Sequence, residues 1–199
     1  GTGTGYFNIR AKKTWVVETR RSISDYLYVQ TVNLDSTETS YLTGAKWEAT
    51  GQTSGKMMFG YLKKDLDAIT QSDFNGTTAS GEIVWQPRPV DRFTLTLQRS
   101  ANESPQATAS YYLKNNLAIS WEHMLTELTS IDANANVQKD DYSDQRADEL
   151  KMFSIRLRYS LSRLLNFDLK YAHTSRGSNE SSAIFDNNII MLSLGGAAL

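Results

Sequence analysis

The sequence predicts an all-β protein, an antiparallel up-and-down transmembrane β-barrel of the bacterial outer membrane. Short turn-like segments alternate with long polar stretches, and the segments between them alternate apolar with polar residues. An aromatic residue recurs beside the short turns: Trp47, Trp85, Trp121 and Tyr159 follow one another at intervals of 38, 36 and 38 residues. That interval fits one hairpin with its loop, so it predicts a repeated strand pair.

The first strand is expected at Gly3 to Arg10, and ten more follow it. The expected short turns lie at Ala11 to Thr14, Gly51 to Ser54, Pro87 to Arg92, Met124 to Glu127 and Ser162 to Leu164. The expected long connections lie at Ser22 to Thr39, Asp65 to Thr78, Ala101 to Ser110, Lys139 to Glu149 and Thr174 to Ala183. Strands of about ten residues suit a tilted crossing of the hydrocarbon layer.

Each expected strand has an apolar and a polar face. The clearest case sets Leu113, Leu117, Ile119 and Trp121 against Lys114, Asn116, Ser120 and Glu122. A later strand sets Phe153, Ile155, Leu157 and Tyr159 against Ser154, Arg156, Arg158 and Ser160. In the last segment, Asn187 to Leu194, a run of four apolar residues leaves the facing open.

The number of expected strands indicates a barrel larger than the given sequence. About 10 to 11 strands are visible, and bacterial single-chain barrels have an even number. We therefore expect residues 1–199 to be a single barrel domain and the C-terminal part of a larger barrel; the alternative is that the first expected strand is an arm.

Composition narrows the functional classes. The chain carries 21 Lys and Arg against 22 Asp and Glu, so no global positive field favours nucleic acid. It has no cysteine, which excludes disulfides and thiolate metal sites. No window approaches 18 consecutive apolar residues, which excludes a membrane-spanning helix, whereas a barrel strand needs only every second residue to be apolar.

A soluble all-β sandwich or barrel is the alternative, because its strands alternate for the same reason with the apolar side inward. Strands about twice the usual five or six residues favour the membrane. Aromatic placement favours it too, since Trp and Tyr prefer the membrane interface. The predicted interface aromatics, all flanking short turns, are Trp15, Trp47, Trp85, Trp121 and Tyr159.

The polar face is predicted to line the pore. The candidate pore-lining residues are Lys46, Glu48, Lys56, Glu82, Lys114, Glu122, Arg156, Arg158, Asp168 and Lys170, and the same set extends to Arg10, Glu18, Arg20 and Asp132. Interspersed signs predict a hydrated wall without a strong ion filter. These charges could equally pair across strands and simply stabilise the barrel, so both interpretations stand.

No arrangement of residues predicts catalysis, a cofactor or a metal site. His123 and His173 lie on different expected strands and form no metal motif. Asp140, Asp141, Asp144, Asp148 and Glu149 crowd one expected loop without the spacing or glycine of a calcium loop. We interpret this cluster as a solvated acidic loop, cross-linked at most by divalent ions to lipopolysaccharide.

Several short motifs resemble one protein family. They are Thr50-Gly51-Gln52-Thr53-Ser54-Gly55, Phe59-Gly60-Tyr61, Phe74-Asn75-Gly76, Trp85-Gln86-Pro87, Asp91-Arg92-Phe93-Thr94-Leu95 and Arg99-Ser100. Together they resemble the putative β-barrel porin 2 family, over about Lys12 to Leu194. The resemblance implies an outer-membrane barrel associated with exopolysaccharide or capsule export, with glycines that permit close strand approach and no catalytic residue.

The sequence therefore predicts a porin-like barrel, not an enzyme, that is a conduit or partner in exopolysaccharide export. Its expected partners are outer-membrane lipid and lipopolysaccharide, with polysaccharide and export-complex proteins as further candidates. The alternative is a surface anchor or adhesin-type barrel whose long extracellular loops bind partners.

Overall fold

The computed structural model describes residues 1–10, 12–24, 36–66, 73–104, 109–162 and 165–196. The strands are β1 (Thr2–Arg10), β2 (Lys13–Ser24), β3 (Ser36–Thr50), β4 (Thr53–Leu66), β5 (Phe74–Arg88), β6 (Asp91–Glu103), β7 (Tyr111–Met124), β8 (Thr129–Tyr142), β9 (Ala147–Ser160), β10 (Leu165–Ser178) and β11 (Phe185–Gly196). One short 3₁₀ turn, η1, covers Ser181–Ala183. No helix in the described residues is long and apolar enough to cross a membrane.

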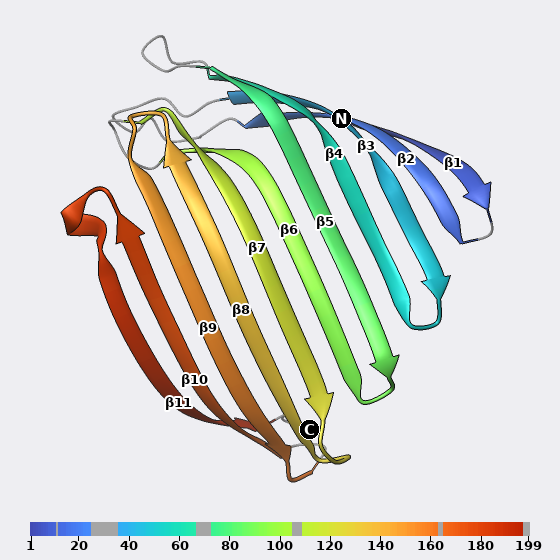
Figure 1. The fold of residues 1–199 in the computed structure, drawn as a ribbon, viewed down its shortest axis with the longest axis vertical. Coiled ribbons are helices and arrows are strands. Elements are labelled where there is room, and N and C mark those ends of the chain that lie inside the picture. Colours follow the sequence, from blue (N-terminus) through green and yellow to red (C-terminus); the bar gives the residue numbers. More distant parts are fainter. Residues whose placement is uncertain (11, 25–35, 67–72, 105–108, 163–164, 197–199) are drawn as a thin grey trace.

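The strands form one antiparallel sheet in which each strand pairs with the next along the chain, from β1 to β11. Figure 1 shows this sheet as a strongly curved wall, with β1 and β11 at its two opposite sides. The turns that follow β3, β5 and β7 lie at one edge of the wall, and those that follow β8 and β10 lie at the opposite edge. The predicted fold class, an all-β antiparallel meander of the transmembrane-barrel type, is confirmed.

The ladders sort the side chains onto two faces. In β1–β10 the odd-numbered residues share one face, which we name the apolar face, and the even-numbered residues share the opposite polar face. Leu157 pairs with Leu169, which pairs with Leu192, so one row of leucines crosses three strands. In a sheet with no layer covering this face, such side chains stay exposed, as the 49 % exposure of Leu169 shows.

The same ladder assigns the last strand, whose facing the sequence left open. Ile190 pairs with Tyr171 and Leu192 with Leu169, so both lie on the apolar face, where each is 77 % exposed. Ile189 and Met191 consequently point to the polar face.

Several strands run further than the sequence predicts. The expected loop Lys139 to Glu149 is wrong: β8 continues to Tyr142 and β9 begins at Ala147, so only residues 143–146 connect them. Of the predicted acidic loop, only Asp144 lies in the connection. Asp140 and Asp148 lie on the polar face and Asp141 and Glu149 on the apolar one. Hydrogen-bonded pairing continues where apolar alternation has stopped, because the ladder uses backbone groups.

Two glycines allow β3 and β4 to approach closely. A Cβ at Gly44 would overlap the carbonyl oxygen of Met57, and a Cβ at Gly60 would overlap the carbonyl oxygen of Tyr41. These glycines are therefore required by space, since no glycine has a positive φ in the described chain. The close approach expected of the motif glycines is thus seen at Gly60, and Gly44, which lies in none of the quoted motifs, has the same role.

At one corner of the sheet the pairing of β5 with β6 ends at Ala79 and Arg99, and the two strands separate (Figure 1). Beyond that point Leu62, Phe74 and Ala101 form a small buried core, and the Phe74 and Tyr111 rings lie 5.2 Å apart. Beside it the buried Lys64 places Nζ 2.6 Å from Oε1 of Glu103. Apolar and ionic contacts thus join the strands at this corner.

Candidate pore wall

All ten candidate pore-lining residues lie on the polar face. Lys46 pairs with Lys56, which pairs with Glu82, in one row across β3, β4 and β5. On the far side of the sheet, Arg158 pairs with Asp168 and Arg156 with Lys170. Lys114 and Glu122 occupy the same face of β7, and Glu48 that of β3. The ladder brings these residues onto one wall because all of them are even-numbered and the side-chain period is two. The side chain of Arg10 lies outside the described residues.

Part of this wall is held by ion pairs. Both Arg156 Nε and Nη2 lie 2.8 Å from Oδ2 of Asp132. Arg158 donates from Nε and Nη2 to the two oxygens of Asp168, at 2.7 and 3.3 Å. The two arginines of β9 are thus flanked by carboxylates of β8 and β10. This arrangement gives the pairing interpretation a concrete form in the later strands.

A second group of charges pairs in the early strands. Glu18 is 6 % exposed and accepts a hydrogen bond of 2.7 Å from Arg20, while Lys56 Nζ lies 3.8 Å from its other oxygen. In contrast, six of the ten candidates make no ion pair within the described part of the chain: Lys46, Glu48, Glu82, Lys114, Glu122 and Lys170. The polar face therefore combines charges that are paired with charges that make no ion pair in the described part of the chain.

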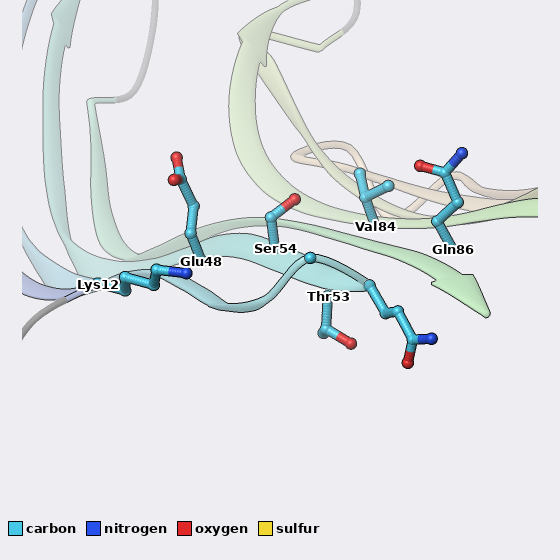
Figure 2. A pocket seen from close by; sticks show the side chains of 8 residues that line it. Lys12, Glu48, Thr53, Ser54, Val84 and Gln86 are labelled. Atoms are coloured by element: carbon cyan, nitrogen blue, oxygen red, sulfur yellow. The ribbon is translucent and has the colours of Figure 1, made fainter. Parts of the chain in front are cut away.

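A cavity of about 270 Å³ lies at the short-turn edge of the wall, lined by Lys12 and by residues of β3, β4 and β5. Figure 2 shows Glu48, Ser54, Val84 and Gln86 pointing to one side, whereas Thr53 points to the other. The same view therefore displays the alternation that separates the two faces. The cavity places polar side chains at one mouth of the predicted pore.

A second cavity, of about 290 Å³, lies on the polar face between β2 and β6. Its charged lining includes Glu18, Arg20 and Lys56, and its apolar lining includes Met58 and Leu62. Met58 and Leu62 are almost fully buried, although they stand on the face that the sequence predicts to be polar. Over β2–β4 this face is thus partly filled by its own side chains.

A polar network closes the opposite end of β8–β10. Arg146 donates to both oxygens of Asp148, at 3.0 and 2.7 Å, and to Glu180 at 3.1 Å. The hydrogen bonds to Asp148 raise the pKa of Arg146 above its ordinary value, so it is charged at any physiological pH. The Arg146 guanidinium also lies 5.1 Å from the centre of the Tyr142 ring, which stacks on Tyr112.

Sequence reasoning missed this network because it placed these acids in a loop. A usable signal was present, since Asp140 and Asp148 continue the even-numbered positions of the polar face and face each other across the ladder. Oδ1 of Asp140 is buried without a hydrogen bond. In the described part of the chain no group of three or more His, Asp or Glu side chains is placed to hold a metal ion.

The five predicted interface aromatics all lie on the apolar face near the short turns. Three strands carry a continuous stack there: Trp85 and Phe93 lie 5.2 Å apart, and Phe93 and Trp121 lie 6.2 Å apart. Trp47 instead covers Gly55, where a Cβ would overlap its indole ring. The rings thus form a band at one height, whereas their membrane-interface role stays a prediction.

Asp91 anchors this band; in the sequence it stood out only as part of a family motif, and no contact was predicted for it. It is 2 % exposed, and it accepts hydrogen bonds from Trp121 Nε1 at 3.2 Å and from Arg88 Nε at 2.6 Å. Its Oδ1 also lies 2.8 Å from Nδ1 of His123. A buried carboxylate needs such partners, so Asp91 fixes the orientation of the Trp121 indole.

Solved structures of two other proteins are among those that resemble this chain. The chain overlays the FrpB iron transporter of Neisseria meningitidis (F3-3 variant) with a TM-score of 0.59 and 10 % identity, covering 92 % of this chain and 36 % of that one. It also matches a FadL homologue of Pseudomonas aeruginosa with a TM-score of 0.48 and 8 % identity, over 98 % of this chain and 65 % of that one.

The first of these likenesses shows the fold, and the chain spans about a third of that transporter's length. No curated protein matches the sequence. Residues 16–197 match the family described as Putative beta-barrel porin 2. The exposed apolar face, the charged opposite face and this match over nearly the whole chain lead to one conclusion: the chain belongs to the Putative beta-barrel porin 2 family.

Proposed function

We propose that this chain forms the wall of an outer-membrane pore that serves as a conduit, or as a partner, in exopolysaccharide export. The observation that carries the proposal is the inverted polarity of the sheet. Large apolar side chains such as Leu117 and Ile119 are about half exposed, whereas charged side chains such as Glu18 on the opposite face are buried. A face of this kind is stable in lipid, where exposed apolar groups cost nothing.

The chemistry of the polar face suits a hydrated polymer. Positive and negative side chains are interspersed on it, and several are already paired, as Arg158 is with Asp168. A wall of compensated charge exerts no strong net field, so it offers hydrogen bonds to a polyol chain without trapping it at one site. Outer-membrane lipid and lipopolysaccharide would contact the opposite face, and export-complex proteins the rims.

Two measurements test the proposal. Protein reconstituted in planar bilayers is expected to conduct, and Lys46→Gln should lower the preference for anions, because Lys46 is exposed on the polar face and makes no ion pair in the described chain. Lys151→Gln is the matched control, since Lys151 lies on the apolar face. Deleting the gene should retain polymer inside the cell. Unchanged polymer secretion would contradict the proposed role in export, and the proposed pore would be unaffected by that result.

A second candidate function has its own observation. Val16 has no exposed surface and Met58 has 2 %, so over β2–β4 the polar face is packed. A barrel filled in this way would act as an anchor whose extracellular connections bind partners. The absence of any conductance in planar bilayers, together with loss of cell-surface binding after loop deletion, would favour this function over a conduit.

A further inference from the structure

Two basic side chains face each other directly on the polar face of β9 and β10. Arg156 and Lys170 are partners in the ladder between these strands. Like charges directly opposite each other destabilise an antiparallel strand pair. The next pair on the same face has the favourable arrangement, since Arg158 is the partner of Asp168 and donates hydrogen bonds to both of its oxygens. The sheet gains no stability from the opposition of Arg156 and Lys170, so the role of this pair lies elsewhere.

Lys170 has no counter-ion among the side chains that surround it. β10 lies inside the sheet, so both of its neighbouring strands are described, and Met191 is the partner of Lys170 on β11. The side chains that lie diagonally across the two ladders, or two positions away along β10, are Ser154, Arg158, Asp168, Ala172, Ile189 and Ser193. Asp168 is the one carboxylate in that set, and both of its oxygens already accept hydrogen bonds from Arg158. Lys170 accordingly makes no ion pair with any described residue.

Arg156 also keeps hydrogen-bonding capacity. Its Nε and Nη2 both approach one oxygen, Oδ2 of Asp132, at 2.8 Å. A guanidinium has five N–H donors, so this single oxygen engages only part of them. The side chain of Arg156 is 40 % exposed, and Lys170 is exposed as well. Both cations can therefore reach a ligand at the polar face.

The charges around the pair leave one positive charge uncompensated. Three cations and two carboxylates make up this cluster: Arg156, Arg158, Lys170, Asp132 and Asp168. The next carboxylate of the row, Glu122 of β7, stands three strands from Lys170. At a strand spacing of ~4.8 Å that is about 14 Å, beyond the screening length of about 8 Å at physiological salt. A residual charge of this size suits a single monovalent anion.

We propose that Arg156 and Lys170 bind the carboxylate of an acidic sugar, a uronate unit of the polymer that passes along this wall. This inference rests on the proposed function and names its substrate class. The planar guanidinium of Arg156 matches the geometry of a carboxylate, and the Lys170 ammonium adds a point charge. Asn134 and Ser154, partners in the adjacent row of the same face, supply an amide and a hydroxyl for the sugar hydroxyl groups.

Saturation-transfer NMR of the ligand tests the site without requiring conductance. Protein from outer membranes, embedded in lipid nanodiscs, is titrated at constant ionic strength with trigalacturonate, and with uncharged maltotriose as the control ligand. We expect the wild type to bind trigalacturonate more tightly than maltotriose. Lys170→Gln should weaken trigalacturonate binding about tenfold or more, because an ionised donor is lost, whereas Lys170→Arg should retain it.

Lys114→Gln is the matched control variant, because it removes a positive charge from the same face on β7, where the ladder partner of Lys114 is Asp140. It should bind trigalacturonate as the wild type does. All three variants are expected to fold, since neither lysine makes an ion pair in the described part of the chain, and heat-modifiable migration checks this.

Three results would overturn the site. These are equal binding of the two saccharides, equal losses for Lys170→Gln and Lys114→Gln, and binding of inorganic phosphate without binding of trigalacturonate, which would assign the pair to a free anion. The site and the conduit fail separately. Wild-type protein that binds trigalacturonate without conducting would contradict the conduit alone, and protein that conducts without binding it would contradict the acidic-sugar site alone.

Discussion

Placing a charge on the apolar face tests the central structural claim. Leu169 lies in the row that joins Leu157 to Leu192, and its side chain is 49 % exposed in the absence of lipid. Leu169→Arg puts a guanidinium at that position, which costs about 2–4 kcal/mol near the bilayer midplane. The folded-to-unfolded ratio should therefore fall by about 30-fold to several hundred-fold. Ala172→Arg on the same strand is the matched control, because Ala172 faces the polar side.

The assay is equilibrium unfolding of the lipid-inserted protein in denaturant, followed by the fluorescence of its four tryptophans. Leu169→Arg is expected to lower the free energy of unfolding by the amount above, and Ala172→Arg by less than about 1 kcal/mol. Equal losses for the two variants would refute the assignment of faces. A wild-type protein that stays monomeric without detergent would refute the claim that the sheet spans a membrane, since a soluble sheet must cover its apolar face.

Three further outcomes are expected. Gly44→Ala should reduce the yield of folded, heat-modifiable barrel, because its Cβ would overlap a neighbouring carbonyl oxygen. The control Gly51→Ala should fold normally, because no atom lies within 4 Å of the Cβ it would add. Equal yields of the two variants would contradict the close approach of β3 and β4. Arg158→Gln should leave the carboxylate of Asp168 uncompensated. We expect a loss of about 1 kcal/mol in the free energy of unfolding and a reversal potential shifted toward cation preference. An unchanged reversal potential would place Arg158 outside the lumen. Gly55→Val should displace the indole of Trp47 and red-shift its fluorescence, and an unaltered spectrum would show that the ring does not depend on that glycine.

The sequence was enough to assign most residues of the polar face, because the side chains of a β-strand alternate between its two faces. Once Phe153, Ile155 and Leu157 are assigned to one face, Arg156 and Arg158 must occupy the other, whatever the neighbouring strands are. The short turns were predictable for a similar local reason, since Gly51 and the Pro89–Val90 turn sit where both flanking patterns stop.

The strand ends were not predictable in this way. Apolar alternation reports only the part of a strand that meets lipid, whereas β8 and β9 continue into polar sequence through backbone pairing. The expected loop at residues 139–149 was wrong for that reason. The network around Arg146 and Asp148 was missed together with it, because its members are adjacent only once the ladder is extended.

The sequence by itself determined the class of fold, the two chemical faces and the height of the aromatic band, because these depend on periodicity along one strand. Only the tertiary structure decided which charges pair, as Arg156 does with Asp132, because that depends on register between strands. It also decided the facing of Ile190 and Leu192, the packed corner around Phe74 and the common direction of β1 and β11. Those features arise from how strands meet, and a single strand carries no information about its neighbour's register.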